Sequence, residues 1–179
     1  ADIRVTSAMQ TRLPWLILNL LTALISATVL SLFENTIAQV AVLAAFFPVV
    51  AGVSGSAGTQ TLTVTVRGLA LGDISPKEGI KAIGRELLIG LVNGISIGLI
   101  VAVIALIWKG TPILGLIVGI ATLLNMICAA LAGVMMPMLM QRLNFDPALA
   151  SPILVTTTTD TLGYLFYLGL ATLLITSLV

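Results

Sequence analysis

Residues 148–179 read ALASPILVTTTTDTLGYLFYLGLATLLITSLV, an apolar stretch in which Asp160 is the only charged residue. The stretch exceeds the roughly 20 residues that a helix needs to cross a bilayer. A carboxylate at membrane depth costs about 3 kcal/mol or more on insertion scales. Asp160 therefore needs a cation, a proton or water, and an acid at such depth usually belongs to an ion or substrate path.

The composition of the whole chain indicates a membrane protein. Hydrophobic residues make up 59% of the 179 residues and charged residues only 8%, whereas a soluble domain carries about 25% charge. We expect one all-α domain, because open strands cannot span lipid. The net charge of +1 argues against a nucleic-acid partner. With no histidine and one cysteine, Cys128, a metal would have to accept oxygen ligands, which favours Mg²⁺ or Ca²⁺.

The apolar segments divide this domain into five predicted spans. They lie at about 13–33, 36–71, 79–108, 113–140 and 148–178. The second is too long for one straight crossing, so it must extend beyond the bilayer or break inside it. Ser75-Pro76 and Asp146-Pro147 each predict an N-cap followed by the first residue of a helix, for the third and fifth spans.

The basic residues predict the orientation of the five spans. Only Lys109 falls on one side, and the other seven fall on the opposite side: Arg4, Arg12, Arg67, Lys77, Lys81, Arg85 and Arg142. Because cytoplasmic loops carry the excess of Lys and Arg, we expect a multi-pass protein of the inner (plasma) membrane. Its N-terminus would be cytoplasmic and its C-terminus outside.

Two groups of residues are candidates for an ion path. Thr156 and Gly163 share a helical face with Asp160 and are candidate metal-site residues with it. Pro152 leaves the carbonyl of Ala148 without its helical donor. The second group is a glycine-rich polar run in the second span. The pore-lining candidates are Gly52, Gly55, Ser56, Gly58, Thr59, Gln60, Ala148 and Pro152.

Structural roles remain open for these residues. Small residues also let helices pack closely, threonines can bond to carbonyls of the preceding turn, and Asp160 could be a structural acid held by its threonines. Glycines four residues apart, at 90, 94 and 98 and at 115 and 119, predict tight packing of the third and fourth spans. Asn93 and Asn125 predict interhelical hydrogen bonds. The sequence contains no nucleophile–base pair at membrane depth, so we do not expect an enzyme.

Four stretches together resemble the transmembrane domain of the MgtE family of magnesium channels. They are PWLILNLLT at 14–22, FENTIAQ at 33–39, GSAGTQ at 55–60 running on to RGLA at 67–70, and DPA at 146–148 followed by TTTTD at 156–160. The resemblance implies a homodimer whose second and fifth helices line a central pore, with Asp160 holding hydrated Mg²⁺. Ser56 and Thr59 stand where family members often carry Asn. Relatives carry cytoplasmic N and CBS domains, which we expect to be absent here.

Three functions are compatible with these residues. The first is passive conduction of Mg²⁺, and of other divalent cations that the sequence does not discriminate, into the cytoplasm. The second is a cation-coupled exchanger in which Asp160 alternately binds Mg²⁺ and H⁺ or Na⁺. The third is a membrane scaffold or receptor module that transports nothing. The first needs no ATP motif, because the membrane potential supplies about 2.3 kcal/mol per charge per 100 mV.

Overall fold

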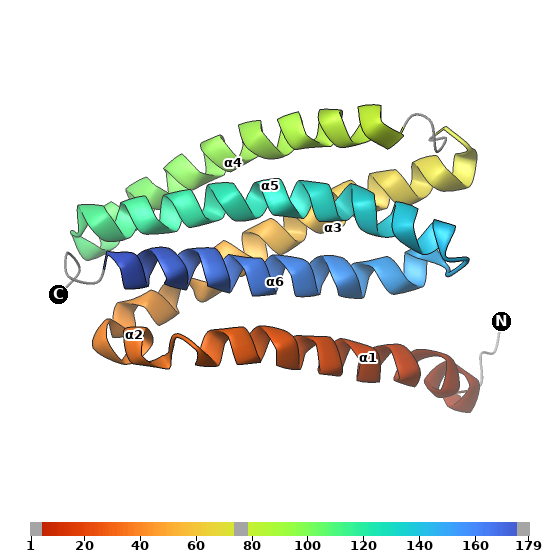
Figure 1. Ribbon diagram of the computed structural model, residues 1–179, viewed down its shortest axis with the longest axis horizontal. Coiled ribbons are helices and arrows are strands. Elements are labelled where there is room, and N and C mark those ends of the chain that lie inside the picture. The colour runs from red at the N-terminus through yellow and green to blue at the C-terminus, as the bar shows by residue number, and fades with distance from the viewer. Residues whose placement is uncertain (1–4, 74–78, 175–179) are drawn as a thin grey trace.

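The computed structural model describes residues 5–73 and 79–174, and it is all-helical over those residues. Five long helices run back and forth along one direction (Figure 1). They are α1 (Val5–Ser31), α3 (Phe47–Leu71), α4 (Gly79–Lys109), α5 (Pro112–Arg142) and α6 (Pro147–Leu173). Two short helices, α2 (Glu34–Gln39) and the 3₁₀ helix η1 (Ala41–Phe46), connect α1 to α3. The predicted all-α, multi-span fold is confirmed.

The second predicted span breaks, which is one of the two outcomes that its length allowed. The helical chain stops at Val40, which separates α2 from η1, and α3 starts at Phe47 with Pro48 in its first turn. Proline is tolerated there because the first N–H groups of a helix have no intrahelical partner. At its other end α3 stops at Gly72, whose φ of 76° is left-handed and suits glycine. The predicted cap at Ser75-Pro76 lies outside the described residues.

Four of the long helices contain windows apolar enough to cross a membrane, within the part of the chain that the structure describes. The exception is α6, where Asp160 and its threonines lower the hydropathy. It nevertheless runs the length of α5 beside it (Figure 1), so we treat it as the fifth span. Because the helices alternate in direction, Arg12, Arg67 and Arg142 lie at one end of the bundle and Lys109 at the other.

Helix α5 lies at the centre of the bundle, with α3, α4 and α6 packed around it. In the most apolar 18-residue stretch of α5, 61% of the residues are buried. The corresponding share is 6% in α1, which packs along α6 at the edge. The α4–α5 contact uses the predicted glycines: a Cβ added at Gly98 would lie 2.7 Å from the Gly119 carbonyl oxygen, and one at Gly115 would lie 2.7 Å from that of Ala102. The backbones therefore touch, as predicted.

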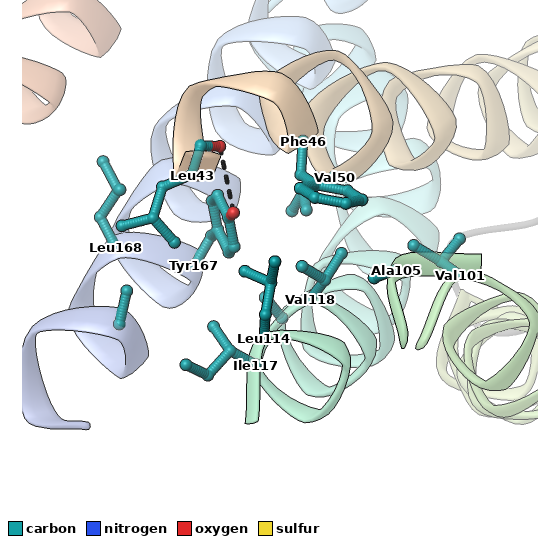
Figure 2. Packing of buried hydrophobic residues seen from close by; sticks show 12 residues of the cluster. Leu43, Phe46, Val50, Val101, Ala105, Leu114, Ile117, Val118, Tyr167 and Leu168 are labelled. Carbon is teal, nitrogen blue, oxygen red and sulfur yellow. Dashed lines mark hydrogen bonds between the residues drawn. The ribbon is translucent and has the colours of Figure 1, made fainter. Parts of the chain in front are cut away.

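The main hydrophobic core lies where η1 and the start of α3 meet α5 and α6. Figure 2 shows Leu43, Phe46 and Val50 facing Val118 and Tyr167. The hydroxyl of Tyr167 is fully buried and donates a hydrogen bond to the carbonyl of Leu43 at 3.0 Å. This bond ties the 3₁₀ segment to α6.

Candidate functional site

The start of α6 is built as the sequence predicts. The Asp146 carboxylate accepts a hydrogen bond from the backbone N–H of Ala148 at 2.8 Å, and Pro147 is the first helical residue. One turn later Pro152 lies inside the helix. Because proline has no N–H, the carbonyl of Ala148 lacks its helical donor. Ala148 and Pro152 are both exposed, at the end of the bundle where Arg12, Arg67 and Arg142 lie.

Helices α3 and α6 run antiparallel, and their contacts fix the depth of Asp160. A Cβ added at Gly55 would lie 3.6 Å from the Thr159 hydroxyl oxygen, and one at Gly163 would lie 3.7 Å from the Ala51 Cα. Asp160 therefore lies opposite the stretch 51–55 of α3. Its side chain is half-buried. Gly52, within that stretch, is exposed and has nothing within 4 Å of an added Cβ, so the α3 wall is open at this depth.

Thr156, Asp160 and Tyr164 are spaced four residues apart and so share one face of α6. Thr156 is exposed and lines a 330 Å³ recess between α1 and α6 with Trp15 and Asn19. Tyr164 packs edge-on against Phe47 of α3, with ring centroids 5.6 Å apart. The face that carries the acid is therefore bordered by α1 at one level and by α3 at another.

The neighbouring threonines use their protons on the backbone. Thr157 and Thr158 each donate to the carbonyl four residues earlier at 2.7 Å, and Thr159 donates to that of Thr156 at 3.0 Å. A hydroxyl has a single proton to donate. These three threonines therefore do not hold the Asp160 carboxylate, which weakens the interpretation of Asp160 as a purely structural acid. Thr161 instead pairs with Ser26 of α1 at 2.8 Å.

The outer face of α3 presents oxygen atoms. Ser56, Thr59 and Thr63 are exposed, and each hydroxyl donates to the carbonyl four residues earlier at 2.8–2.9 Å. With their protons used in this way, the hydroxyl oxygens offer only lone pairs to the outside. Such a face can accept hydrogen bonds from the water shell of a cation.

Other predicted site residues have packing positions. Gly58 is buried, and an added Cβ would lie 2.8 Å from Val155 Cγ1. Gly163 is buried as well, and its Cβ would lie 2.6 Å from the Asn125 Nδ2. Asn125 thus fills the space beside Gly163, one turn beyond the acid. Gln60 lines a different recess, of 240 Å³, between α3, α4 and α5.

Sequence reasoning missed two parts of this site. Tyr164 lies four residues after Asp160, and that spacing alone was enough to place it on the same face. The neighbours from α1, Trp15 and Asn19, carry no such signal, because nothing in the sequence says which helix packs beside α6. Asn125 was predicted to make interhelical hydrogen bonds, and it does, to α3 and α6.

Carboxylates are sparse in the described residues. Residues 5–73 and 79–174 contain no group of three or more His, Cys, Asp or Glu side chains able to hold a metal. A divalent ion at Asp160 would therefore be bound by one acid per chain, hydroxyl and carbonyl oxygens, and water. Mg²⁺ suits such a set, since it dehydrates reluctantly and usually keeps several waters.

The chain matches a family model over most of the helical domain. Residues 47–170, which run from the start of α3 nearly to the end of α6, match the model for MgtE, described as a divalent cation transporter. The matched range contains both Asp160 and the outer face of α3.

Relatives with this name align with nearly the whole chain. The protein named magnesium transporter MgtE in Bacillus subtilis (strain 168) is 38% identical over 177 residues, which is 99% of this chain and 39% of the relative. The proteins of the same name in Enterococcus faecalis and Thermus thermophilus are 38% and 35% identical over 90% and 92% of this chain. The chain spans less than two fifths of the length of these relatives.

Proposed function

Because the chain belongs to the MgtE family of divalent cation transporters, we propose that it conducts hydrated Mg²⁺ passively into the cytoplasm, with Asp160 as the main charge on the path. The observation that carries this proposal is the half-buried Asp160 carboxylate at the level of the open wall of α3. The three relatives named as magnesium transporters favour Mg²⁺ as the ion. The proposal extends to other divalent cations of similar hydrated size.

The ion is expected to keep its water shell. A single carboxylate cannot replace the octahedral shell that Mg²⁺ demands. Asp160 would instead accept hydrogen bonds from bound waters, and charge-assisted bonds of this kind are about twice as strong as neutral ones. The exposed hydroxyl oxygens of Ser56 and Thr59 can accept further ones. For a divalent ion, an interior potential of −100 mV supplies about 4.6 kcal/mol of inward drive.

A homodimer completes the path in this proposal. The exposed polar face of α3 lies on a helix of membrane-spanning length, and lipid offers no hydrogen-bond donors to the free lone pairs of its hydroxyl oxygens. Two copies with their α3 faces together would enclose a polar, water-filled space and bring two Asp160 side chains to it. A twofold dimer is also the commonest symmetric assembly.

Mg²⁺ flux into liposomes that contain the chain tests the proposal. Asp160→Asn keeps the shape of the side chain and removes its charge, so we expect flux to fall about tenfold or more. Asp146→Asn is the matched control: it removes the same charge from the exposed N-cap of α6, where asparagine caps equally well. Equal flux through the Asp160→Asn and unchanged proteins would refute the role of Asp160.

The same assay separates a channel from an exchanger. Passive conduction predicts uptake that follows the Mg²⁺ gradient and the membrane potential alone. If uptake required an opposing H⁺ or Na⁺ gradient, Asp160 would be an alternating ion site instead. Absence of flux in a correctly folded protein would point to a scaffold.

A further inference from the structure

Asn125 of α5 joins three helices at one point. Its side-chain Nδ2 donates to the carbonyl of Val50 in α3 at 3.1 Å and to the carbonyl of Thr159 in α6 at 3.0 Å. The side chain is fully buried. Both protons of one amide are thus used on two different helices, at the depth where those helices pass each other.

The second acceptor is the peptide group next to Asp160. The carbonyl of Thr159 and the backbone nitrogen of Asp160 belong to the same planar peptide unit. A hydrogen bond to that carbonyl therefore holds in place the peptide unit that joins Thr159 to Asp160. Gly163 completes the arrangement, because any side chain there would begin 2.6 Å from the Asn125 Nδ2.

The two backbone carbonyls do not need the hydrogen bonds that the Asn125 amide donates. Both acceptor carbonyls lie inside helices, where they already accept from the N–H four residues later. The Oδ1 atom of Asn125 has no hydrogen-bond partner among the described protein atoms, and neither do the hydroxyls of Ser54 and Thr122. An apolar side chain of similar size would leave no such unpaired acceptor. The polar residue needs another reason to be there.

We propose that Asn125 is a positioning residue for Asp160: by tying the Thr159–Asp160 peptide to α3, it sets the rotation and depth of the carboxylate in the ion path. The inference rests on the proposed function of Asp160. Without the tie, α6 can rotate or slide against α3, and the carboxylate no longer lies opposite the open wall at Gly52.

Flux measurements distinguish positioning from simple packing. Asn125→Leu and Gly163→Ala should each raise the Mg²⁺ concentration for half-maximal flux, and the concentration of cobalt hexammine for half-inhibition, about three- to tenfold. Asn93→Leu, at an exposed asparagine of α4, is the matched control and should change neither.

In an Asp160→Asn background, Asn125→Leu should have no further effect on half-saturation. A lower maximal flux with unchanged half-saturation, or effects that add in the double variant, would overturn the inference.

A structural measurement tests the tie without relying on flux. In a Cys128→Ala background, Gly55→Cys and Thr159→Cys should form a disulfide rapidly, because a Cβ at Gly55 lies 3.6 Å from the Thr159 hydroxyl oxygen. Adding Asn125→Leu should slow that cross-link about threefold or more, and an unchanged rate would overturn the inference. If Asp160→Asn lowers flux as expected while the Asn125 variants behave as wild type, only this inference fails. If Asp160→Asn leaves flux intact, the proposed function fails.

Discussion

Gly52 and Gly58 lie on the same helix and look alike in the sequence, but their surroundings are opposite. Gly52 is exposed and open, whereas Gly58 lies against Val155 and Ala129. For the glycine-rich run of the second span, the sequence predicted either a pore lining or close packing of helices. The structure assigns close packing to Gly58 and an open wall to Gly52, because only one side of α3 faces α5 and α6.

This difference predicts opposite effects on stability. Gly58→Ala should destabilise the folded protein by about 1–3 kcal/mol, since its methyl group would meet the stiff Val155 side chain at 2.8 Å. Gly52→Ala should be neutral or stabilise by up to about 1 kcal/mol through helix propensity. Unfolding in mixed micelles by titration with SDS measures both, and equal effects would contradict the packing described here.

At the scale of elements, the hydroxyl of Tyr167 ties the 3₁₀ segment η1 to α6. Tyr167→Phe removes the hydrogen bond to the Leu43 carbonyl and should cost about 1 kcal/mol. Backbone amides of η1 should then exchange hydrogen about fivefold faster. Tyr164→Phe, which retains the aromatic contact with Phe47, is the control and should leave exchange in η1 unaltered.

The contact between α4 and α5 depends on glycine backbones. Gly98→Leu should separate the two helices and cost about 3 kcal/mol or more, because the first added atom already lies 2.7 Å from the Gly119 carbonyl oxygen. Gly84→Leu on the same helix has open space around it and should cost little. Thermal unfolding in detergent compares the two variants; a stable Gly98→Leu protein would refute the close approach.

The sequence predicted the positions of the helices better than it predicted which face of each helix is buried. Pro147 starts α6 as its pairing with Asp146 predicted, because proline favours the first turn of a helix. Helix α5 starts at Pro112, one residue before the predicted span. The length of the second span predicted either a break or an extension beyond the bilayer, but not the position of the break at Val40. The burial of Gly163 against Asn125 was not predicted. Which neighbour fills the space beside a glycine depends on packing between helices, and one sequence does not encode that in any local pattern.

At the scale of the whole molecule, alternating helices predict that the two ends of the bundle lie on opposite sides of the membrane. In a Cys128→Ala background, Asp73→Cys and Lys109→Cys should react with a membrane-impermeant thiol reagent from opposite sides. Asp73 is expected on the cytoplasmic side, since Arg12, Arg67 and Arg142 share its end of the bundle. Labelling from the same side would refute the five-span arrangement.

The proposed dimer predicts a specific contact between two copies. Ser56→Cys, on the exposed polar face of α3, should cross-link between protomers in a Cys128→Ala background. Leu99→Cys, on the exposed apolar side of α4, should not. Cross-linking at Leu99 with none at Ser56 would place the interface on another face.

The low hydropathy of α6 also has a consequence for biosynthesis. Its described residues contain no window as apolar as those of the other long helices, and a central acid opposes partition from the translocon into lipid by about 3 kcal/mol. Helix α6 leaves the ribosome after α3 and α5, which are then already in the membrane. The amide of Asn125 and the glycines of α3 then offer it a surface that bulk lipid lacks. We expect α6 to integrate poorly when fused to an unrelated secretory protein and efficiently behind its own preceding helices, as glycosylation of a tag placed after it would report.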